Sequence, residues 1–245
     1  MRVWITGASS GIGLAVAQHY AHLGHEVIIS ARRAEVLEAL APTLPAHALP
    51  LDVTDRAAVH DAIARIESER GPIDLAILNA GTYVVTPAAE FTSDAATRMM
   101  TVNYFGFCHA LEALMPVMRA RGRGQIAAMS SLAGYVGLPY AGPYAASKSA
   151  VMRLCESLVS ELARDGVHIS VINPGFVRTP LTDHNDFPMP WIVEAADAAQ
   201  WIERGLAAGK FEIRFPRRLA WTMRLLSILP DRLFFAITRR MLRNP

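Results

Sequence analysis

The sequence predicts an α/β fold in which a doubly wound parallel sheet of about seven strands carries helices on both faces. Short apolar runs of strand length alternate with longer segments of helical periodicity along the whole chain. This alternation favours parallel strands joined by crossover helices. A glycine-rich turn follows the first run and polar residues follow most of the others, at the strand ends where open α/β sheets bind ligands.

The expected strands are short and rich in apolar residues. The first, RVWIT, begins near the amino terminus. The fourth, IDLAIL, is apolar almost throughout, as expected for a central strand that is buried on both faces. The seven runs cover residues 2–6, 26–31, 46–51, 73–78, 125–129, 167–172 and 210–215.

The segments between these runs carry helix signals. Thr54 or Asp55 is placed to cap a helix that continues to Glu69. Pro116 lies inside another helical segment, which we expect it to kink rather than end. The other expected helices cover residues 14–23, 93–102, 105–121, 142–163 and 193–208.

The composition limits the class of protein. The chain has 245 residues, of which 52% are hydrophobic, and it shows no repeat or low-complexity linker, so we expect residues 1–245 to form one domain. The formal net charge of +2 gives no indication of nucleic-acid binding. No apolar run reaches the ~18–20 residues that cross a bilayer, and the first residues run directly into the glycine-rich turn without a signal peptide. We therefore expect a cytoplasmic protein.

Cysteine and histidine give no sign of a disulfide framework or a metal site. The two cysteines, Cys108 and Cys155, lie in apolar helical segments, which favours buried thiols. Three of the eight histidines, His19, His22 and His25, cluster near the end of the first helix, and neither His19 nor His22 has an adjacent acidic or cysteine residue. Because protein metal sites need three or four converging ligands, we expect no metal.

Residues 131–148 carry the strongest catalytic signal. Tyr144 and Lys148 lie four residues apart on an expected helix, so their side chains share one face, and Ser131 precedes them. A cation beside a phenol favours the phenolate, so we expect Lys148 to lower the pKa of Tyr144 from about 10 and make it a usable proton donor. Because the chain has 22 arginines and only two lysines, a chance partner would more often be arginine. The alternative is a surface lysine on an amphipathic helix.

Gly7, Gly11 and Gly13 lie between the first strand and the first helix. A strand, a glycine-rich turn and a helix form a phosphate-binding arrangement, because glycines let the backbone approach closely and the helix start offers free N–H groups. The spacing G-x-x-x-G-x-G differs from the common dinucleotide fingerprint. A glycine-rich turn without a ligand is the alternative.

The second strand is followed directly by Arg32 and Arg33, and no acidic residue occurs before Glu35. At this position an acid selects NAD through the ribose hydroxyl, whereas an arginine accommodates the 2′-phosphate of NADP. The residues therefore favour NADP(H), with NAD(H) as the alternative. A second alternative is that both arginines simply open a solvated helix.

Together these motifs resemble the single-domain branch of the short-chain dehydrogenase/reductase family. The resemblance covers about the first 180 residues, in the family's order and spacing. It implies a Rossmann-type fold and an oxidoreductase that interconverts an alcohol and a ketone or aldehyde by hydride transfer. The matching segments are TGASSGIG (6–13), LDVTD (51–55), NAG (79–81), VNYFG (102–106), SSLAG (130–134), YAASK (144–148) and NPGFVRTPL (173–181).

The resemblance also implies roles for single residues. Tyr144 would be the general acid/base, Lys148 would lower its pKa and bind the nicotinamide ribose, and Ser131 would bind the substrate oxygen. Asn103 would shape the local helix and hold a water in the proton relay. The residues expected at the cofactor are Gly7, Ser9, Ser10, Gly11, Ile12, Gly13, Arg32, Arg33, Asp52, Val53, Asn79, Ala80, Gly81, Tyr144, Lys148, Pro174, Gly175, Val177 and Thr179.

Parts of this set would serve different parts of the cofactor. The three glycines would line the pyrophosphate, Asp52 and Val53 would face the adenine with residues 79–81 supporting that side, and the turn at 174–175 with Thr179 would contact the nicotinamide. Many NADP-preferring relatives have a second basic residue where this chain has Ser10. The expected NADP preference therefore rests on Arg32 and Arg33.

Residues 216–245 are expected to form an amphipathic helical extension. The stretch 219–229 is nearly all apolar, and Asp231 can cap a final helix that continues to Arg243 with its arginines on one side. Three interpretations remain open: packing on the domain or a second subunit, peripheral contact with a membrane, and a lid over the substrate pocket. Membrane contact would suit a lipophilic substrate.

The expected partners are a small carbonyl or alcohol substrate and further copies of the chain. The apolar residues 187–191 are suited to line a substrate pocket. Relatives commonly form homodimers or homotetramers through the helices at 105–121 and 142–163. Two other functions stay open: an isomerase or dehydratase that uses a bound nucleotide, and a catalytically silent nucleotide sensor or scaffold.

Overall fold

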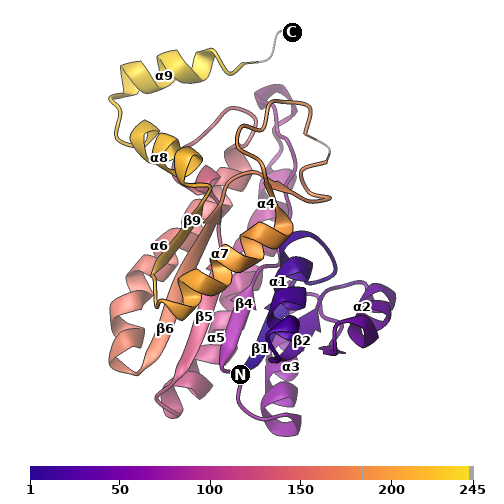
Figure 1. The fold of residues 1–245 in the computed structure, drawn as a ribbon. Helices are drawn as coiled ribbons and strands as arrows, with labels where there is room; N and C mark the ends of the chain where they lie inside the picture. Colours follow the sequence, from indigo (N-terminus) through magenta and orange to yellow (C-terminus); the bar gives the residue numbers. More distant parts are fainter. Residues whose placement is uncertain (184, 243–245) are drawn as a thin grey trace.

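The sheet at the centre of the molecule is parallel, as the sequence predicts (Figure 1). The structure is a computed structural model that describes residues 1–183 and 185–242, and within these residues the sheet has seven strands in the spatial order β3-β2-β1-β4-β5-β6-β9. The strands are β1 (Arg2–Thr6), β2 (Glu26–Ser30), β3 (Ala46–Ala48), β4 (Leu75–Leu78), β5 (Gly124–Met129), β6 (Val167–Pro174) and β9 (Glu212–Phe215).

The order of the strands reverses at β1. The chain runs from β1 to β2 and β3 on one side, and then returns to place β4 on the other side, so that Ile5 lies between Ile29 and Ile77. The loops that follow the two neighbouring strands diverge at such a point and leave a crevice at the carboxyl edge of the sheet. The glycine-rich turn after β1 and the residues after β4 therefore border the same crevice.

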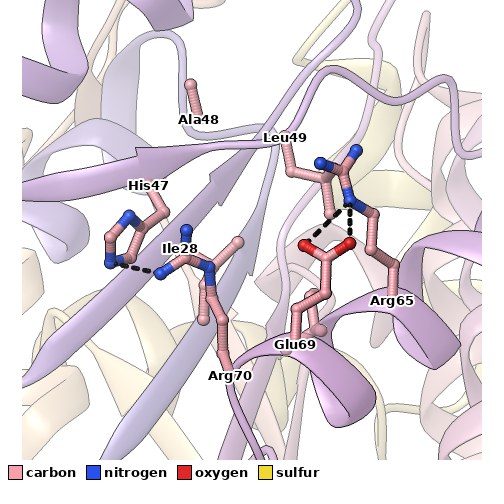
Figure 2. A pocket seen from close by; sticks show the side chains of 8 residues that line it. Ile28, His47, Ala48, Leu49, Arg65, Glu69 and Arg70 are labelled. Carbon is pink, nitrogen blue, oxygen red and sulfur yellow. Dashed lines mark hydrogen bonds and ion pairs between the residues drawn. The ribbon is translucent and has the colours of Figure 1, made fainter.

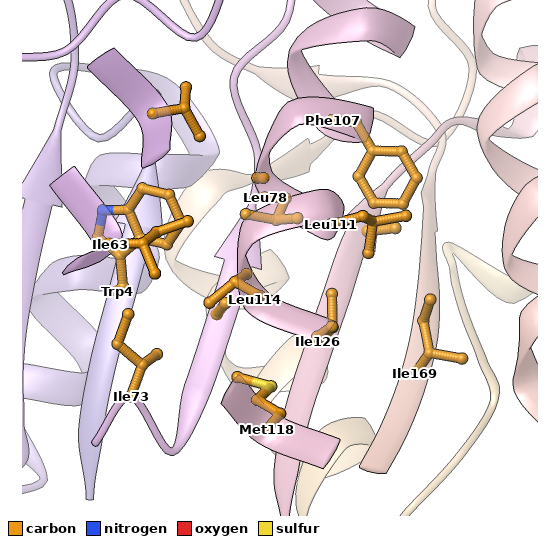
Figure 3. Close-up of a cluster of buried hydrophobic side chains, with 14 of the residues drawn as sticks. Trp4, Ile63, Ile73, Leu78, Phe107, Leu111, Leu114, Met118, Ile126 and Ile169 are labelled. Carbon is orange, nitrogen blue, oxygen red and sulfur yellow. The ribbon is translucent and has the colours of Figure 1, made fainter. Parts of the chain in front are cut away.

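Helices cover both faces of the sheet and bury it. On one face Trp4, Leu114 and Ile126 belong to a single apolar core (Figure 3). On the other face α1 and α7 lie side by side (Figure 1). The first layer consists of α3 (Arg56–Glu69), α5 (Gly106–Ala120) and α6 (Gly142–Arg164), and the second of α1 (Gly11–His22), α2 (Ala34–Leu40) and α7 (Ala195–Ala207).

The predicted elements differ from the structure mainly at their ends. Of the two expected caps of α3, Asp55 fills the position, because its carboxylate accepts a hydrogen bond from the backbone N–H of Ala58 at 3.0 Å. The helix expected over 193–208 begins two residues later. The reason is that β8 (Val193–Glu194) pairs with β7 (Val177–Arg178) in a short parallel ladder.

The helices expected over 93–102 and 105–121 are joined without a break. Helix α4 (Ser93–Met100) continues into a π-helical segment (Thr101–Phe105), which leads directly into α5. Wide turns of this kind are rare and are frequent at functional sites. Pro116 lies inside α5 without ending it.

Two helices follow the last strand. Helices α8 (Arg217–Leu226) and α9 (Asp231–Arg239) lie beyond the carboxyl edge of the sheet (Figure 1). Leu219 and Met223 of α8 pack with Leu132, which follows β5, and the partly buried Phe234 of α9 joins this cluster.

The last helix begins one residue before the predicted start, which had Asp231 as the cap. Pro230 is its cap and Asp231 its first residue. The helix ends at Arg239, with Arg240 as its carboxyl-terminal cap, so the prediction that it continues to Arg243 is wrong; Arg243 itself lies outside the described residues. Within those residues, no helix is both long and apolar enough to cross a bilayer. The assignment of residues 1–245 to one domain stays a prediction.

Gly166, which joins α6 to β6, gives a test of the fold. Its φ of +72° is left-handed, and a Cβ there would overlap the carbonyl oxygen of Gly122. We expect Gly166→Ala to lower the free energy of unfolding by about 2–4 kcal/mol, because left-handed strain adds to overpacking. Gly24→Ala is the matched control, since its φ is +79° with open space around it, and it should lose only about 1 kcal/mol. Denaturant titration measures both, and equal losses would contradict the packing of Gly166 on Gly122.

Candidate active site

A cavity of about 830 Å³ opens at the carboxyl edge of the sheet. It lies at the switch point between β1 and β4 and extends to the start of α6. All the sequence-predicted site residues line it except Gly13 and Asn103. The structure therefore brings together residues from seven separate segments of the sequence.

A second hollow, between β3 and α3, is far smaller, at about 50 Å³ (Figure 2). Its polar side chains are already paired with one another. Arg65 donates to Glu69 at 3.0 Å, and Arg70 lies 2.8 Å from the ring nitrogen of His47. This hollow has neither the room nor the available polar groups for a ligand.

The glycine-rich turn is shaped by positive φ angles and by Asn79. Gly7 and Gly11 have φ of +67° and +58°, which favour glycine. The Asn79 amide donates hydrogen bonds to the carbonyl oxygens of Thr6 at 3.0 Å and Gly7 at 3.2 Å, so it ties the end of β4 to the turn.

Gly13 acts differently from the prediction that it lines the pyrophosphate site. A Cβ on Gly13 would overlap the carbonyl oxygen of Gly7 and lie 2.5 Å from Nδ2 of Asn79. Gly13 is therefore required beneath the turn, where it permits close packing, and it does not line the cavity.

The cavity is electropositive. Four cationic side chains line it against a single carboxylate, that of Asp52, among the described lining residues. One oxygen of Asp52 is already engaged, since it accepts hydrogen bonds from the backbone N–H and the hydroxyl of Thr54 at 2.9 and 2.8 Å. The cavity is thus suited to an anionic ligand. The four cations are Arg32, Arg33, Arg98 and Lys148.

Arg33 and Ser9 join the two loops at one end of the cavity. The Arg33 guanidinium donates to the Ser9 hydroxyl at 3.1 Å. Arg32 and Ser10 line the same end. The pair of arginines therefore lies beside the glycine-rich turn, where the sequence places it.

Tyr144 and Lys148 lie together in the cavity wall, on the first turns of α6. The ammonium nitrogen of Lys148 is 5.8 Å from the centre of the Tyr144 ring and donates to the carbonyl oxygen of Met129 at 2.9 Å. Lys148 is 3% exposed, and this burial lowers its pKa to about 8. The Tyr83 ring packs on Tyr144 edge to face, with centres 4.9 Å apart.

The expectation that Lys148 lowers the pKa of Tyr144 is wrong for this structure. Desolvation by burial raises the pKa of Tyr144 to about 12. A hydrogen bond with Ser131 acts in the lowering direction, and Tyr83 acts in the raising direction. The reason is that loss of water opposes the phenolate more strongly than the neighbouring groups favour it.

The two adjacent serines have different surroundings. The Ser130 hydroxyl is buried and donates to the backbone carbonyl of Lys148 at 2.8 Å. The Ser131 hydroxyl lies near the Tyr144 phenol, accepts from the backbone N–H of Ala133 at 3.1 Å and donates to the carbonyl oxygen of Pro174 at 3.4 Å. Ser131 is therefore the serine whose hydroxyl meets the phenol, which agrees with the choice made from its spacing.

Asn103 lies behind the cavity wall rather than in it. Its side chain is buried on the π-helical segment, where it accepts from the backbone N–H of Thr82 at 2.7 Å and donates to the Thr82 carbonyl at 3.0 Å. It also donates to the Ser147 hydroxyl at 2.9 Å. Asn103 thus fixes the chain that follows β4 against α6.

A family model described as short chain dehydrogenase matches residues 1–187. The chain belongs to the short chain dehydrogenase family. An oxidoreductase of uncharacterized activity from Myxococcus xanthus is 36% identical over 97% of this chain and 96% of that protein. The fold agrees with this assignment, since it superposes with a TM-score of 0.85 on a short-chain dehydrogenase from Streptomyces avermitilis (27% identity, 98% and 95% of the two chains). A short-chain dehydrogenase from Burkholderia cenocepacia in complex with NADP gives 0.84 (26% identity, 99% and 98%).

Sequence analysis missed several residues that line the cavity of this short chain dehydrogenase. Thr182 orders the loop after β7, because its hydroxyl donates to the carbonyl oxygen of Val177 at 2.7 Å. Conversely, the apolar residues 187–191, expected at the pocket, do not line it. Several of the missed residues lie in loops, where no periodicity indicates which side chains face a cavity. The missed residues are Ala31, Leu51, Thr82, Arg98, Val102, Met129, Ser130, Pro180, Leu181 and Thr182.

The burial of Lys148 predicts a pH-dependent stability. The unfolded chain keeps the lysine proton up to about pH 10.5, whereas the folded chain releases it near pH 8, so Lys148 makes stability rise with pH across this window. We expect the free energy of unfolding of the native protein, measured relative to Lys148→Met, to increase by about 3 kcal/mol from pH 7 to pH 10.5. Denaturant titrations at several pH values measure this difference.

Lys210→Met, at the exposed second lysine, is the matched control for that measurement. A difference for Lys148 that stays no larger than the Lys210 difference would show that the ammonium is not desolvated.

Proposed function

We propose that this member of the short chain dehydrogenase family is an NADP(H)-dependent oxidoreductase that interconverts an alcohol and a ketone or aldehyde. The observation that carries the proposal is the convergence of the Ser131 hydroxyl, the Tyr144 phenol and the Lys148 ammonium in the wall of one electropositive cavity. Positioned acid–base groups of this kind contribute about 10²–10⁴ in rate.

The residues at the cavity fit a dinucleotide phosphate. The start of α1 and the glycine-rich turn would hold the pyrophosphate, and Arg32 with Arg33 would hold the 2′-phosphate. Asp52, Val53 and residues 79–81 would border the adenine side. Lys148 would bind the nicotinamide ribose, and Pro174, Gly175, Val177 and Thr179 would border the ring. When bound, this cofactor supplies or accepts the hydride.

The raised pKa of Tyr144 favours the reducing direction. A phenol with a pKa of about 12 is protonated near neutral pH, so it can donate a hydrogen bond and then a proton to a carbonyl oxygen. Ser131 would share the developing negative charge on that oxygen. Lys148 would stabilise the phenolate that remains, because its own pKa of about 8 keeps it cationic at neutral pH. Asn103 would hold the wall behind them, and a water relay through it belongs to this proposal.

The substrate end of the cavity supports a lipophilic carbonyl or alcohol. Val102, Met129 and Leu181 line the cavity, and apolar surfaces of this kind accept aliphatic or aromatic groups. We further propose that the protein is cytoplasmic and forms a homodimer or homotetramer through α5 and α6. An isomerase or dehydratase and a silent sensor remain the alternative functions, and the unbroken set of Ser131, Tyr144 and Lys148 favours the redox enzyme over both.

Removal of the phenol tests the catalytic assignment. We expect Tyr144→Phe to reduce turnover of a carbonyl panel to below a few per cent, because the proton donor is lost, while NADPH still binds. Tyr83→Phe is the matched control. It removes the hydroxyl from the ring that packs on Tyr144 and should keep most of the activity. NADPH absorbance measures turnover, and fluorescence measures binding. Substantial turnover by Tyr144→Phe would refute the assignment.

The cofactor preference depends on the two arginines after β2. We expect the double change Arg32→Ala, Arg33→Ala to lower the ratio of kcat/KM for NADPH to that for NADH by about 10- to 100-fold, as loss of charged phosphate contacts implies. Arg98→Ala serves as the control, because it removes a cation from the same cavity but not beside Ser9. A ratio that falls equally in the control and the double variant would assign the preference to overall charge rather than to these arginines.

A further inference from the structure

Helix α8 has apolar side chains on two opposite sides. The inner side is buried against the segment after β5 by Leu219, Met223 and Leu226. The outer side carries apolar residues at the spacing i, i+4, i+7, which falls on one face of a helix. This outer stripe consists of Trp221 and Leu225 of α8 and of Ile228 in the turn that follows the helix, which are 63%, 58% and 73% exposed.

Helix α9 continues the exposed apolar surface. Its side chains Phe234 and Ile237 are partly covered by the cluster beneath α8, whereas Leu233 and Phe235 are more than half exposed. The apolar face of α9 is therefore wider than the surface of the domain that covers it. Single exposed apolar residues are normal, but several of them on two successive helices indicate a contact surface.

The segment that carries these apolar side chains is rich in arginine. Residues 217–242 contain six arginines and one acidic residue, Asp231. All six arginines are exposed. They are Arg217, Arg218, Arg224, Arg232, Arg239 and Arg240.

Contacts on the inner side fix the direction of the outer stripe. Leu219 fills the space beside Gly175, where a Cβ would lie 2.5 Å from its side chain. Arg224 lies 3.8 Å from the carboxylate of Glu212 on β9. On the outer stripe itself, the guanidinium of Arg214 lies 5.3 Å from the centre of the Trp221 ring. Because α8 is held on β9 and on the cavity turn, the outer stripe cannot rotate inward without breaking these contacts.

We propose that the outer stripe of α8 and the exposed face of α9 dock on the surface of an anionic lipid bilayer. Basic amphipathic helices with aromatic side chains lie in the interface of such bilayers, where lipid head groups neutralise the arginines. A second copy of this chain fits less well, because it would bring the same arginines together. The two helices also lie at the end of the molecule away from the amino terminus (Figure 1), where a flat surface can meet them.

Vesicle flotation of the full chain tests the proposal. We expect the protein to float with vesicles that contain phosphatidylglycerol and to stay unbound with pure phosphatidylcholine, and binding should weaken as salt rises. The pair Trp221→Ser, Leu225→Ser should lower binding by roughly tenfold or more. In the double variant Arg218→Gln, Arg232→Gln, the loss of each arginine should lower vesicle binding about fivefold. These changes are at exposed positions, and thermal melting checks that the variants are folded.

Matched variants elsewhere on the surface distinguish binding by this site from nonspecific binding of the protein to vesicles. Leu23→Ser with Phe91→Ser removes one exposed leucine and one exposed aromatic residue, and Arg123→Gln with Arg164→Gln removes two exposed arginines. Both should bind like the native protein.

Flotation that is absent, or that the control pairs reduce as much as the helix variants do, would overturn the proposal. Concentration-dependent self-association that Trp221→Ser, Leu225→Ser abolishes, without flotation, would show that a second copy covers the stripe instead. Because no readout uses turnover or cofactor, these results are independent of the proposed redox function.

Discussion

Two hydrogen bonds hold the end of β5 against the start of α6. The ammonium of Lys148 donates to the carbonyl oxygen of Met129, and the hydroxyl of Ser130 donates to the carbonyl oxygen of Lys148. The bonds run in opposite directions, so they fix both the distance and the register of the two segments. Ser131 and Tyr144 owe their contact to this pairing, since Ser131 follows directly on one side and Tyr144 lies one turn earlier on the other. The same enclosure desolvates the ammonium, which is why its pKa falls to about 8.

A second polar cluster supports this pairing from behind. Gly81 lies between Asn103 and Lys148, because a Cβ there would be 3.3 Å from the Asn103 oxygen and 3.4 Å from the Lys148 nitrogen. The Ser147 hydroxyl donates to the Tyr144 carbonyl at 2.7 Å and accepts from Asn103. Buried polar groups stabilise a structure only when their partners are in place, so each of these residues depends on the others. Their mutual hydrogen bonds offset the desolvation free energy of burying these polar groups, and they hold this wall of the cavity rigid.

The sequence was sufficient for the sheet and for most of the cavity, because both depend on local signals. The run 73–78 has the length and the apolar character of a buried strand, and motifs at the ends of parallel strands meet at one edge of the sheet. The pKa of Tyr144 was predicted in the wrong direction, since the amount of water excluded depends on all surrounding elements. The π-helical turn at Asn103 was also missed, because it is fixed by a contact with Thr82 that no local pattern encodes. Helix α8 was ambiguous for another reason: it is apolar on two sides, so periodicity did not show which one faces inward.

The contact between Gly175 and Leu219 couples the shape of the cavity to the packing of helix α8. Residue 175 forms part of the cavity wall, and its missing side chain is the space that Leu219 occupies. A larger residue at 175 requires Leu219 to move or to be replaced by a smaller residue, so we expect the two positions to covary among close relatives. Attempts to reshape the pocket for other substrates would therefore have to redesign the turn and the helix together, although they are far apart in the chain.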